Sequence, residues 1–438
     1  MLLSFRVSNH KSIRDEQTLH MQPVYDKGRP ALPVAAIFGA NAAGKSNLLD
    51  ALSFMVHAVR DSFGRWDREE GVPRRPFRLD QEFAATPSRF AVELMLEGVR
   101  YNYGFAIDDD RVHEEWLHSY PVRRRRVIFE RNDSGVRVPA ADSRHRGMAE
   151  FIIEAMPGAL LLSMATLLRI RDVGPIHKWF LDGIAFVDPA RAQFDEAALI
   201  TEVAQTDRSY ARRFVDLVRA ADVDIKGIEA NVALGIGGES VTLDANAVDE
   251  LAKVLGRNPS DAPDNSADLS DMEAELRLIF HQGRHKTRMS LSEQSHGTRV
   301  WLSYLLPILR ALDTGLLLVV DEIDTSLHPH LTAQLIALFR SSDTNPRSAQ
   351  LVFTTHDAAL LGRVHGEDVL GRDEVWFVEK DRDGATSLYA LADFKPRKEE
   401  STERRYLTGS YGAVPMLFEG DFKDAVEANH QAGGRAAS

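Results

Sequence analysis

Eight consecutive residues have the types and spacing of a phosphate-binding loop. Residues 39–46, GANAAGKS, fit the pattern G-x-x-x-x-G-K-[ST]. The glycines let the backbone curve around phosphates, Lys45 reaches the terminal phosphates, and the Ser46 hydroxyl binds Mg2+. A chance match in a Gly/Ala-rich turn is the alternative. The expected nucleotide-binding residues here are Gly39, Ala40, Asn41, Ala42, Ala43, Gly44, Lys45, Ser46 and Asn47.

Two adjacent carboxylates, Asp321 and Glu322, follow the apolar run at 316–320. Carboxylates at the end of a buried strand are costly unless a cation or a polarised water meets them. We therefore expect Asp321 to hold Mg2+, directly or through water, and Glu322 to polarise the attacking water. The alternative is a strand that simply ends in acidic turn residues.

Two further polar segments accompany this pair. His356 follows the apolar run at 350–355, where its imidazole is placed to contact a terminal phosphate. A Ser-x-Gly turn at 295–297 precedes a helical run at 300–312, which is anion-binding geometry. Taken alone, such a turn is more often a plain helix cap. Ala42 is also notable, because alanine is mildly strained wherever the backbone needs a positive φ.

Hydrophobic periodicity predicts the elements that position these residues. The phosphate loop lies between an apolar strand at 34–38 and a helical pattern at 48–63. Before it, strands are expected at 3–7 and 17–21, and a β-meander is inserted after the first helix. The strands of this meander are expected at 90–96, 99–107, 112–119 and 126–130.

The middle of the chain has mainly helical spacing up to about residue 254. A β-like interval at 225–243 interrupts it, and residues 258–271 have the composition of a flexible acidic loop. Helices are expected at 148–156, 159–169, 176–181, 197–204 and 210–220, and later strands at 274–280, 286–289, 375–378 and 387–390.

Composition excludes several classes of protein. The chain has 438 residues, 44% of them hydrophobic, a net charge of −12 and no cysteine, so disulfides and thiolate zinc sites are ruled out. No uninterrupted run of about 18 apolar residues occurs, so we expect a soluble cytoplasmic protein without a membrane partner. A basic segment contains Arg123, Arg124, Arg125 and Arg126 and is followed by Arg131. An exposed hairpin face or turn is the favoured explanation, and a nucleic-acid or partner contact is the alternative.

The order of these motifs resembles ABC-type ATPases of the RecF, SMC and overcoming-lysogenization-defect branch, more than ring-forming AAA+ motors. The resemblance covers roughly residues 1–160 and 270–415. It implies an α/β fold, namely an ABC-type P-loop ATPase head with an inserted β-meander, a helical subdomain and no long coiled-coil arm. The resemblance also implies a division of the chain. Residues 1–160 would form the N-terminal half of the head and residues 271–415 its C-terminal half. Residues 161–270 would form a helical insertion or lid, and residues 416–438 a tail.

The resemblance also implies a mechanism in which ATP and Mg2+ are bound and ATP is hydrolysed. In such ATPases the nucleotide lies between the phosphate loop of one subunit and the signature serine of another. Ser295 and Gly297 would then act in trans, Asp324 would lie at the junction, and the assembly would be at least a head-to-tail dimer. The glutamine-bearing loop of these ATPases has no clear position in this chain.

The C-terminal segments at 391–398 and 406–415 resemble those of compact RloA-like ATPases from restriction and phage-defence loci. This likeness implies a switch that controls a separately encoded effector, often a nuclease. A RecF/SMC-like DNA-repair ATPase that grips DNA is the alternative. A third hypothesis, a nuclease within this chain at Glu379, Asp381 and Asp383, is weaker, because Asp383-Gly384 are turn residues between two predicted strands.

Overall fold

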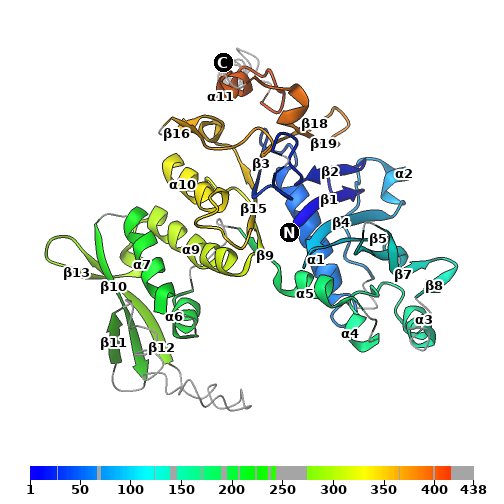
Figure 1. The fold of residues 1–438 in the computed structure, drawn as a ribbon, viewed down its shortest axis with the longest axis horizontal. Helices are drawn as coiled ribbons and strands as arrows, with labels where there is room; N and C mark the ends of the chain where they lie inside the picture. The colour runs from blue at the N-terminus through cyan, green and yellow to red at the C-terminus, as the bar shows by residue number, and fades with distance from the viewer. Residues whose placement is uncertain are drawn as a thin grey trace, which may run out of the picture.

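The computed structural model shows how these elements are arranged in space (Figure 1). The residues that the structure describes are 1–26, 28–66, 71–122, 124–138, 146–168, 170, 172–188, 195–205, 208–221, 224–234, 238–242, 274–364, 366–397 and 400–415.

A six-stranded sheet runs through the middle of the molecule (Figure 1). Its order is β19-β18-β3-β15-β14-β9, and all neighbours are parallel except the β18–β19 hairpin. Parallel strands are buried on both faces, which explains the continuous apolar runs that predicted β3, β14 and β15. The strands are β3 (Val34–Phe38), β9 (Ile184–Val187), β14 (Leu317–Val320), β15 (Gln350–Thr355), β18 (Val375–Lys380) and β19 (Thr386–Ala390).

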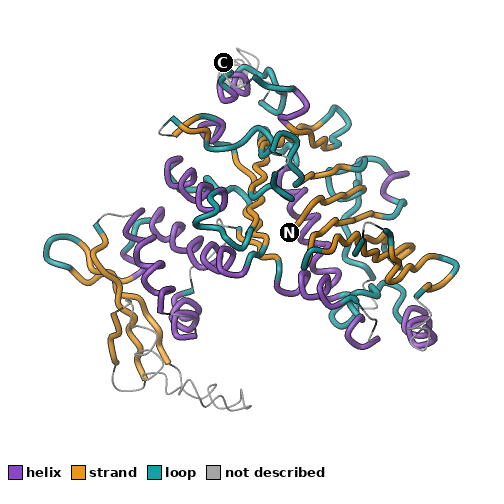
Figure 2. The backbone as a smooth tube through the Cα atoms, viewed as in Figure 1, coloured by secondary structure: helices purple, strands orange, loops and turns teal. Residues whose placement is uncertain are grey.

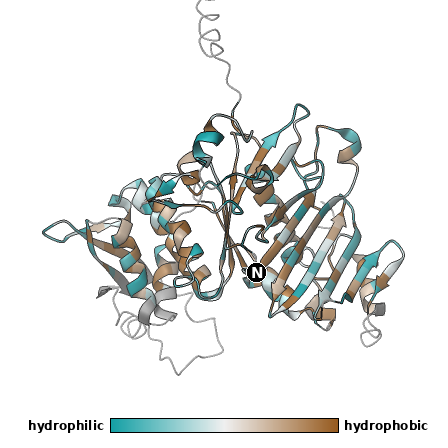
Figure 3. Ribbon diagram, turned by 45° about the horizontal axis from the view of Figure 1, so that its top comes forward, coloured by the Kyte–Doolittle hydropathy of each residue, from teal (hydrophilic) through white to brown (hydrophobic). Residues whose placement is uncertain are grey.

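Side chains of β3 alternate between two hydrophobic cores, one on each face of the sheet. Val34 and Phe38 belong to the core that contains α9 and α10, whereas Ala35 and Ile37 belong to the core that contains α1. Figure 3 shows hydrophobic residues concentrated along the central strands. The helices are α1 (Lys45–Asp61), α9 (His296–Thr314) and α10 (Pro329–Arg340), and none in the described ranges exceeds the 19 residues of α9.

The predicted β-meander is confirmed and forms one antiparallel seven-stranded sheet with the N-terminal strands. Its order is β2-β1-β4-β5-β6-β7-β8. The core on the α1 side of the central sheet lies between this sheet and α1. The elements are β1 (Leu2–Ser8), β2 (Gln17–His20), β4 (Ser88–Leu96), β5 (Val99–Ile107), β6 (Val112–Tyr120), β7 (Arg126–Asn132) and β8 (Gly135–Arg137), with the short helix α2 (Gln81–Ala84) before β4.

The predicted helix at 159–169 is largely wrong, because among the described residues of this range only Ala165–Leu168 is helical. The buried Glu115 carboxylate accepts hydrogen bonds from the amides of Leu161 (2.7 Å) and Leu162 (3.0 Å), so these amides bond outside their own segment. These hydrogen bonds tie the segment to β6. The helices here are α3 (Arg146–Ala155), α4 (Ala165–Leu168), α5 (Gly174–Asp182), α6 (Glu196–Gln205) and α7 (Arg208–Ala221).

A four-stranded antiparallel sheet, β11-β10-β12-β13, lies beside α6 and α7 in a lobe away from the seven-stranded sheet (Figure 2). Because β10 pairs directly with β12, a domain boundary at residue 270 falls within this sheet. The segment 161–270 also supplies β9 to the central sheet, which the sequence analysis did not predict. The strands are β10 (Ile225–Leu234), β11 (Gly238–Thr242), β12 (Ala274–Gln282) and β13 (Thr287–Ser290).

The C-terminal segment packs on the central sheet through aromatic rings. Tyr406 and Tyr411 stack on Phe377 of β18, with ring centroids 5.5 and 5.6 Å away. The remaining elements are α11 (Thr402–Leu407), the β16–β17 pair (Arg363–Val364 and Glu367–Asp368) and the 3-10 helices Leu291–Glu293, Ala358–Leu361 and Leu391–Phe394. The predicted acidic loop at 258–271 and the tail at 416–438 lie outside the described residues.

Across the described part of the chain, every helix is too short or too polar to cross a bilayer.

Candidate nucleotide-binding site

The phosphate loop connects β3 to α1, as its sequence predicts. A Cβ on Gly39 would lie 2.4 Å from the carbonyl oxygen of Val378, and a Cβ on Gly44 would lie 2.2 Å from Thr386 Oγ1. Gly44 also has φ of 109°, which L side chains rarely adopt. Both glycines are therefore required by close approach of the β18–β19 hairpin to the loop.

Ala42 adopts the left-handed conformation, with φ of 63°. The positive angle considered in the sequence analysis is thus present, and an alanine there costs about 1 kcal/mol relative to a relaxed backbone. Glu322 has φ of 54°, so a second non-glycine residue of this region is held in the same conformation. Strained backbone of this kind concentrates at functional sites.

Lys45 is buried and folds back over the loop. Its Nζ donates hydrogen bonds to the carbonyls of Gly39 (2.8 Å) and Ala40 (3.1 Å), and lies 3.1 Å from Nδ1 of His356. Burial lowers the pKa of the Lys45 amine, while the nearby carboxylates, Glu322 first, oppose that shift. The side chain is therefore held in place beside the loop.

Ser46, in the first turn of α1, and Asp321, which follows β14, come together at the carboxyl edge of the central sheet. The Ser46 hydroxyl donates to Asp321 Oδ1 at 3.1 Å, and the Thr354 hydroxyl donates to the same oxygen at 2.5 Å. Hydroxyl and carboxylate oxygens are the donors that Mg2+ prefers. No cluster of three or more His, Cys, Asp or Glu side chains suited to a metal occurs among the described residues. This donor set fits an ion that takes most of its ligands from phosphates and water.

Glu322 and His356 lie close to each other in the pocket beside Lys45. His356 Nε2 lies 3.4 Å from Glu322 Oε1, and the two side chains are 36% and 46% exposed, respectively. A neutral imidazole that accepts from Lys45 at Nδ1 carries its proton on Nε2, facing Glu322. The amide of His356 also lies 3.4 Å from both carboxylate oxygens of Asp324, which places that residue beside the site.

One pocket of about 420 Å³ joins the loop to these residues. Asp321 is not part of its wall and reaches it through Ser46. Among the described residues, no glutamine lines this pocket, so the glutamine-bearing loop still has no assigned position. The lining residues are Asn41, Ala42, Gly44, Lys45, Ser46, Asn47, Glu322, His356 and Lys380.

The Ser-x-Gly turn lies elsewhere in the same chain. Ser295 is the N-cap of α9, where its hydroxyl accepts from the amide of Thr298 at 3.1 Å. A Cβ on Gly297 would lie 3.2 Å from the carbonyl of Ser326, so the turn abuts the loop that contains Asp324. Neither Ser295 nor Gly297 lines the pocket around Lys45.

Sequence reasoning missed four polar residues around the loop: Ser12, Thr354, Thr386 and Lys380. Asn47 donates to Ser12 Oγ (2.6 Å), and the Ser12 and Thr386 hydroxyls lie 2.7 Å apart. Thr386 in turn donates to the carbonyl of Ala43 at 2.9 Å. Only Thr354 had a usable signal, a hydroxyl at the end of an apolar strand that precedes His356.

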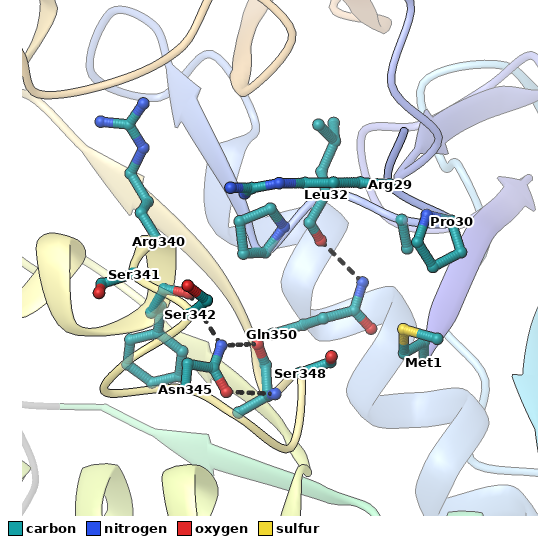
Figure 4. Close-up of a pocket in the computed structure, with 14 residues that line it drawn as sticks. Met1, Arg29, Pro30, Leu32, Arg340, Ser341, Ser342, Asn345, Ser348 and Gln350 are labelled. Atoms are coloured by element: carbon teal, nitrogen blue, oxygen red, sulfur yellow. Dashed lines mark hydrogen bonds between the residues drawn. The ribbon is translucent and has the colours of Figure 1, made fainter. Parts of the chain in front are cut away.

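A second pocket, of about 170 Å³, lies at the amino ends of β3 and β15 and has no such chemistry (Figure 4). Its central side chain, Gln350, bonds to the backbone of Leu2 and Leu32. Asn345 likewise bonds to the backbone of Phe339 and Ala349. These amides serve the structure, since their donors and acceptors are already used within the protein.

The acidic residues proposed for an internal nuclease form a hairpin turn. Asp381 Oδ1 accepts from the amides of Asp383 (2.9 Å) and Ala385 (2.8 Å), and Arg14 approaches both carboxylates. Glu379 bonds to the Tyr389 hydroxyl instead. The hairpin interpretation is confirmed, and the nuclease hypothesis loses its structural basis.

Two arginines of the basic segment pair with acidic side chains of the same chain. Arg125 bonds to Glu130, and Arg126 lies 2.8 Å from Asp172. Arg131, expected on the surface, is buried and donates to the carbonyls of Ala159 and Pro157. Arg123 lies outside the described residues.

A family described as "AAA domain, putative AbiEii toxin, Type IV TA system" matches residues 34–362. The match contains the phosphate loop, Asp321, Glu322 and His356 within a single span. The chain belongs to this family. A search of curated proteins finds no match.

Solved structures similar to this AAA-domain chain include heads of SMC proteins. An SMC head bound to the C-winged helix domain of ScpA is 14% identical, with a TM-score of 0.44 over 90% of this chain and 99% of that one. An SMC head with an extended coiled coil, bound to the C-terminal domain of ScpA from Pyrococcus furiosus, is 11% identical (TM-score 0.40; 90% and 97%). An SMC head with a coiled coil and joint from Pyrococcus yayanosii is 12% identical (TM-score 0.38; 90% and 99%).

Proposed function

We propose that the chain is an ABC-type ATPase whose ATP-dependent head-to-tail dimerisation and hydrolysis act as a switch on a partner effector, a nuclease, in bacterial antiviral defence. One observation carries the ATPase part of this proposal. The phosphate loop, Ser46 with Asp321, and Glu322 with His356 all meet at the carboxyl edge of the central sheet. Ligands of open α/β sheets bind at this edge.

Each residue has a defined role in the proposed hydrolysis. Lys45 and the loop amides hold the phosphates, and Glu322 accepts a hydrogen bond from the attacking water and takes its proton. Through its Nε2, His356 orients the Glu322 carboxylate or the terminal phosphate. Ser46 and Asp321 would hold Mg2+, which neutralises charge on the phosphates when bound.

The first test separates binding from hydrolysis. Lys45→Ala should lose ATP binding, because the cation facing the phosphates is removed. Glu322→Gln should still bind ATP but hydrolyse it at least 100-fold more slowly, since general-base contributions are roughly 10²–10⁴-fold. Equilibrium binding of a fluorescent ATP analogue and phosphate release measure the two steps. Unaltered binding by Lys45→Ala, or wild-type turnover by Glu322→Gln, contradicts the proposed site.

The switch and the defence role rest on the family described as AbiEii-like and on the likeness of the tail to RloA-like ATPases. Their test is the gene beside this one. A nuclease encoded there, active only with the ATP-bound form of this protein, would support the switch. A neighbouring repair operon would favour the alternative.

A DNA-binding repair ATPase of the RecF/SMC type is the second candidate. It needs a basic surface, but Arg125 and Arg126 pair with acidic side chains and the net charge is −12. Its test is DNA affinity measured with and without ATP over a range of salt concentrations. Affinity that rises with ATP and falls steeply with salt would favour this candidate.

A further inference from the structure

Lys380 is a basic side chain that lines the nucleotide pocket but belongs to none of the recognised motifs. It is the last residue of β18, and its side chain is exposed. Within the described ranges, no hydrogen bond or ion pair engages its amine, in contrast to Lys45, which donates to two carbonyls. Glu322 is the sole carboxylate among the residues that line this pocket.

The backbone around Lys380 is tied to the phosphate loop. The strand β18 runs parallel to β3, with Phe377 opposite Phe38, and the carbonyl of Val378 touches Gly39. Lys380 is paired with Thr386, whose hydroxyl donates to the carbonyl of Ala43 at 2.9 Å. The position of the Lys380 backbone relative to the loop is thus fixed by the pairing of β18 with β3 and with β19.

Strand alternation indicates which face of the sheet Lys380 occupies. Trp376 and Val378 belong to the core on the α1 side, whereas Phe377 belongs to the opposite core. Lys380 continues the alternation of Trp376 and Val378 and therefore lies on the side where α1 begins. The amides at the start of α1 favour an anion, so a lysine beside them adds a cation to an anion-binding site.

The order of strands shows which part of the ligand Lys380 can reach. Glu322 and His356 follow β14 and β15, which lie on one side of β3. Lys380 ends β18, which lies on the other side. We propose that Lys380 binds the phosphates that ATP and ADP share, away from the hydrolytic residues. This inference rests on the proposed ATPase function and adds a residue to its binding site.

The test compares nucleotide affinities of Lys380→Ala with those of Lys178→Ala. Lys178 is an exposed lysine of α5, so this control removes the same charge far from the pocket. Titration with fluorescent ATP and ADP analogues, without turnover, should show about a tenfold loss of affinity for both nucleotides in Lys380→Ala and none in the control. Lys380→Arg should keep most of the affinity, because it restores a cation.

The outcomes separate this inference from the proposed function. If the wild-type protein binds neither nucleotide, the ATPase proposal itself fails. If the wild type binds and Lys380→Ala matches the control, or loses ATP affinity but keeps ADP affinity, the assignment of Lys380 to the shared phosphates is wrong. The melting temperatures of the three variants should be equal, so that a loss of affinity in Lys380→Ala reflects the lost contact with phosphate and not a loss of folded protein.

Discussion

A single hydroxyl, that of Thr354, connects the Asp321 carboxylate to the backbone of Glu322. This hydroxyl donates to Asp321 at 2.5 Å and accepts from the amide of Glu322 at 2.7 Å. It thereby fixes both the proposed Mg2+ ligand and the left-handed backbone of the proposed base. Supporting residues that orient metal ligands are worth roughly 10- to 100-fold in metal affinity or activity.

Thr354→Val should therefore reduce ATP hydrolysis by about 10- to 100-fold and raise the Mg2+ concentration needed for half-maximal activity. Valine keeps the shape of threonine and removes only the hydroxyl. The measurement is steady-state phosphate release over a Mg2+ titration. The matched control is Thr332→Val, at a buried hydroxyl of α10 that has no hydrogen-bond partner within the described part of the chain. This substitution should leave the rate unchanged. If Thr354→Val leaves the Mg2+ requirement unchanged, the Thr354 hydroxyl does not orient the proposed Mg2+ ligand Asp321.

At the scale of elements, the buried Glu115 of β6 holds the segment that precedes α4. Its carboxylate accepts from the amides of Leu161 and Leu162 and from the Tyr103 hydroxyl. Burial raises the pKa of Glu115, and the neighbouring Arg131 guanidinium opposes that shift. The network links the meander to the core beneath α1.

Glu115→Gln should destabilise the fold by about 1–3 kcal/mol. The glutamine side chain replaces one acceptor oxygen by an NH2 group, which cannot accept the hydrogen bonds that Leu161, Leu162 and Tyr103 donate. Denaturant unfolding followed by tryptophan fluorescence measures the free energy of unfolding. Glu114→Gln, on the same strand but half exposed and paired with Arg89, should change it by less than about 0.5 kcal/mol. Equal effects of the two substitutions would show that the buried network contributes little.

At the scale of the whole molecule, the phosphate loop and the Ser-x-Gly turn lie apart within one chain. Ser295 caps α9, and Gly297 abuts Ser326, whereas Lys45 lies in the pocket beside His356. We propose that a second copy brings its Ser295 to this pocket. A site shared in this way can be rebuilt from two defective subunits.

A mixture of Lys45→Ala and Ser295→Arg subunits should recover ATP hydrolysis that neither variant shows alone. Each mixed dimer keeps one site with an intact phosphate loop and an intact partner serine. Phosphate release is measured at increasing ratios of the two proteins, and light scattering follows dimerisation. Mixed dimers that form without hydrolysis would argue against shared sites.

The sequence alone determined those features of the protein that depend on residues close together along the chain. The phosphate loop, the apolar strands at 34–38, 316–320 and 350–355, and the acidic pair that follows the second of these strands were all predictable. Each is a local pattern: a run of buried residues ends and chemistry-bearing side chains follow. Parallel strands then bring their carboxyl ends to one edge, which is why separate motifs formed one pocket.

Tertiary structure alone decided the contacts between distant segments. Lys380 and Thr386 reach the loop only because β18 pairs with β3, and no local pattern marks either residue. Glu115 of β6 likewise accepts hydrogen bonds from the amides of Leu161 and Leu162, in a segment where helical periodicity had predicted a helix. The spacing of residues along the chain indicates only their local preference for helix or strand. The positions of Lys380, Thr386 and the segment at 159–164 depend on hydrogen bonds that form only once the sheets have assembled.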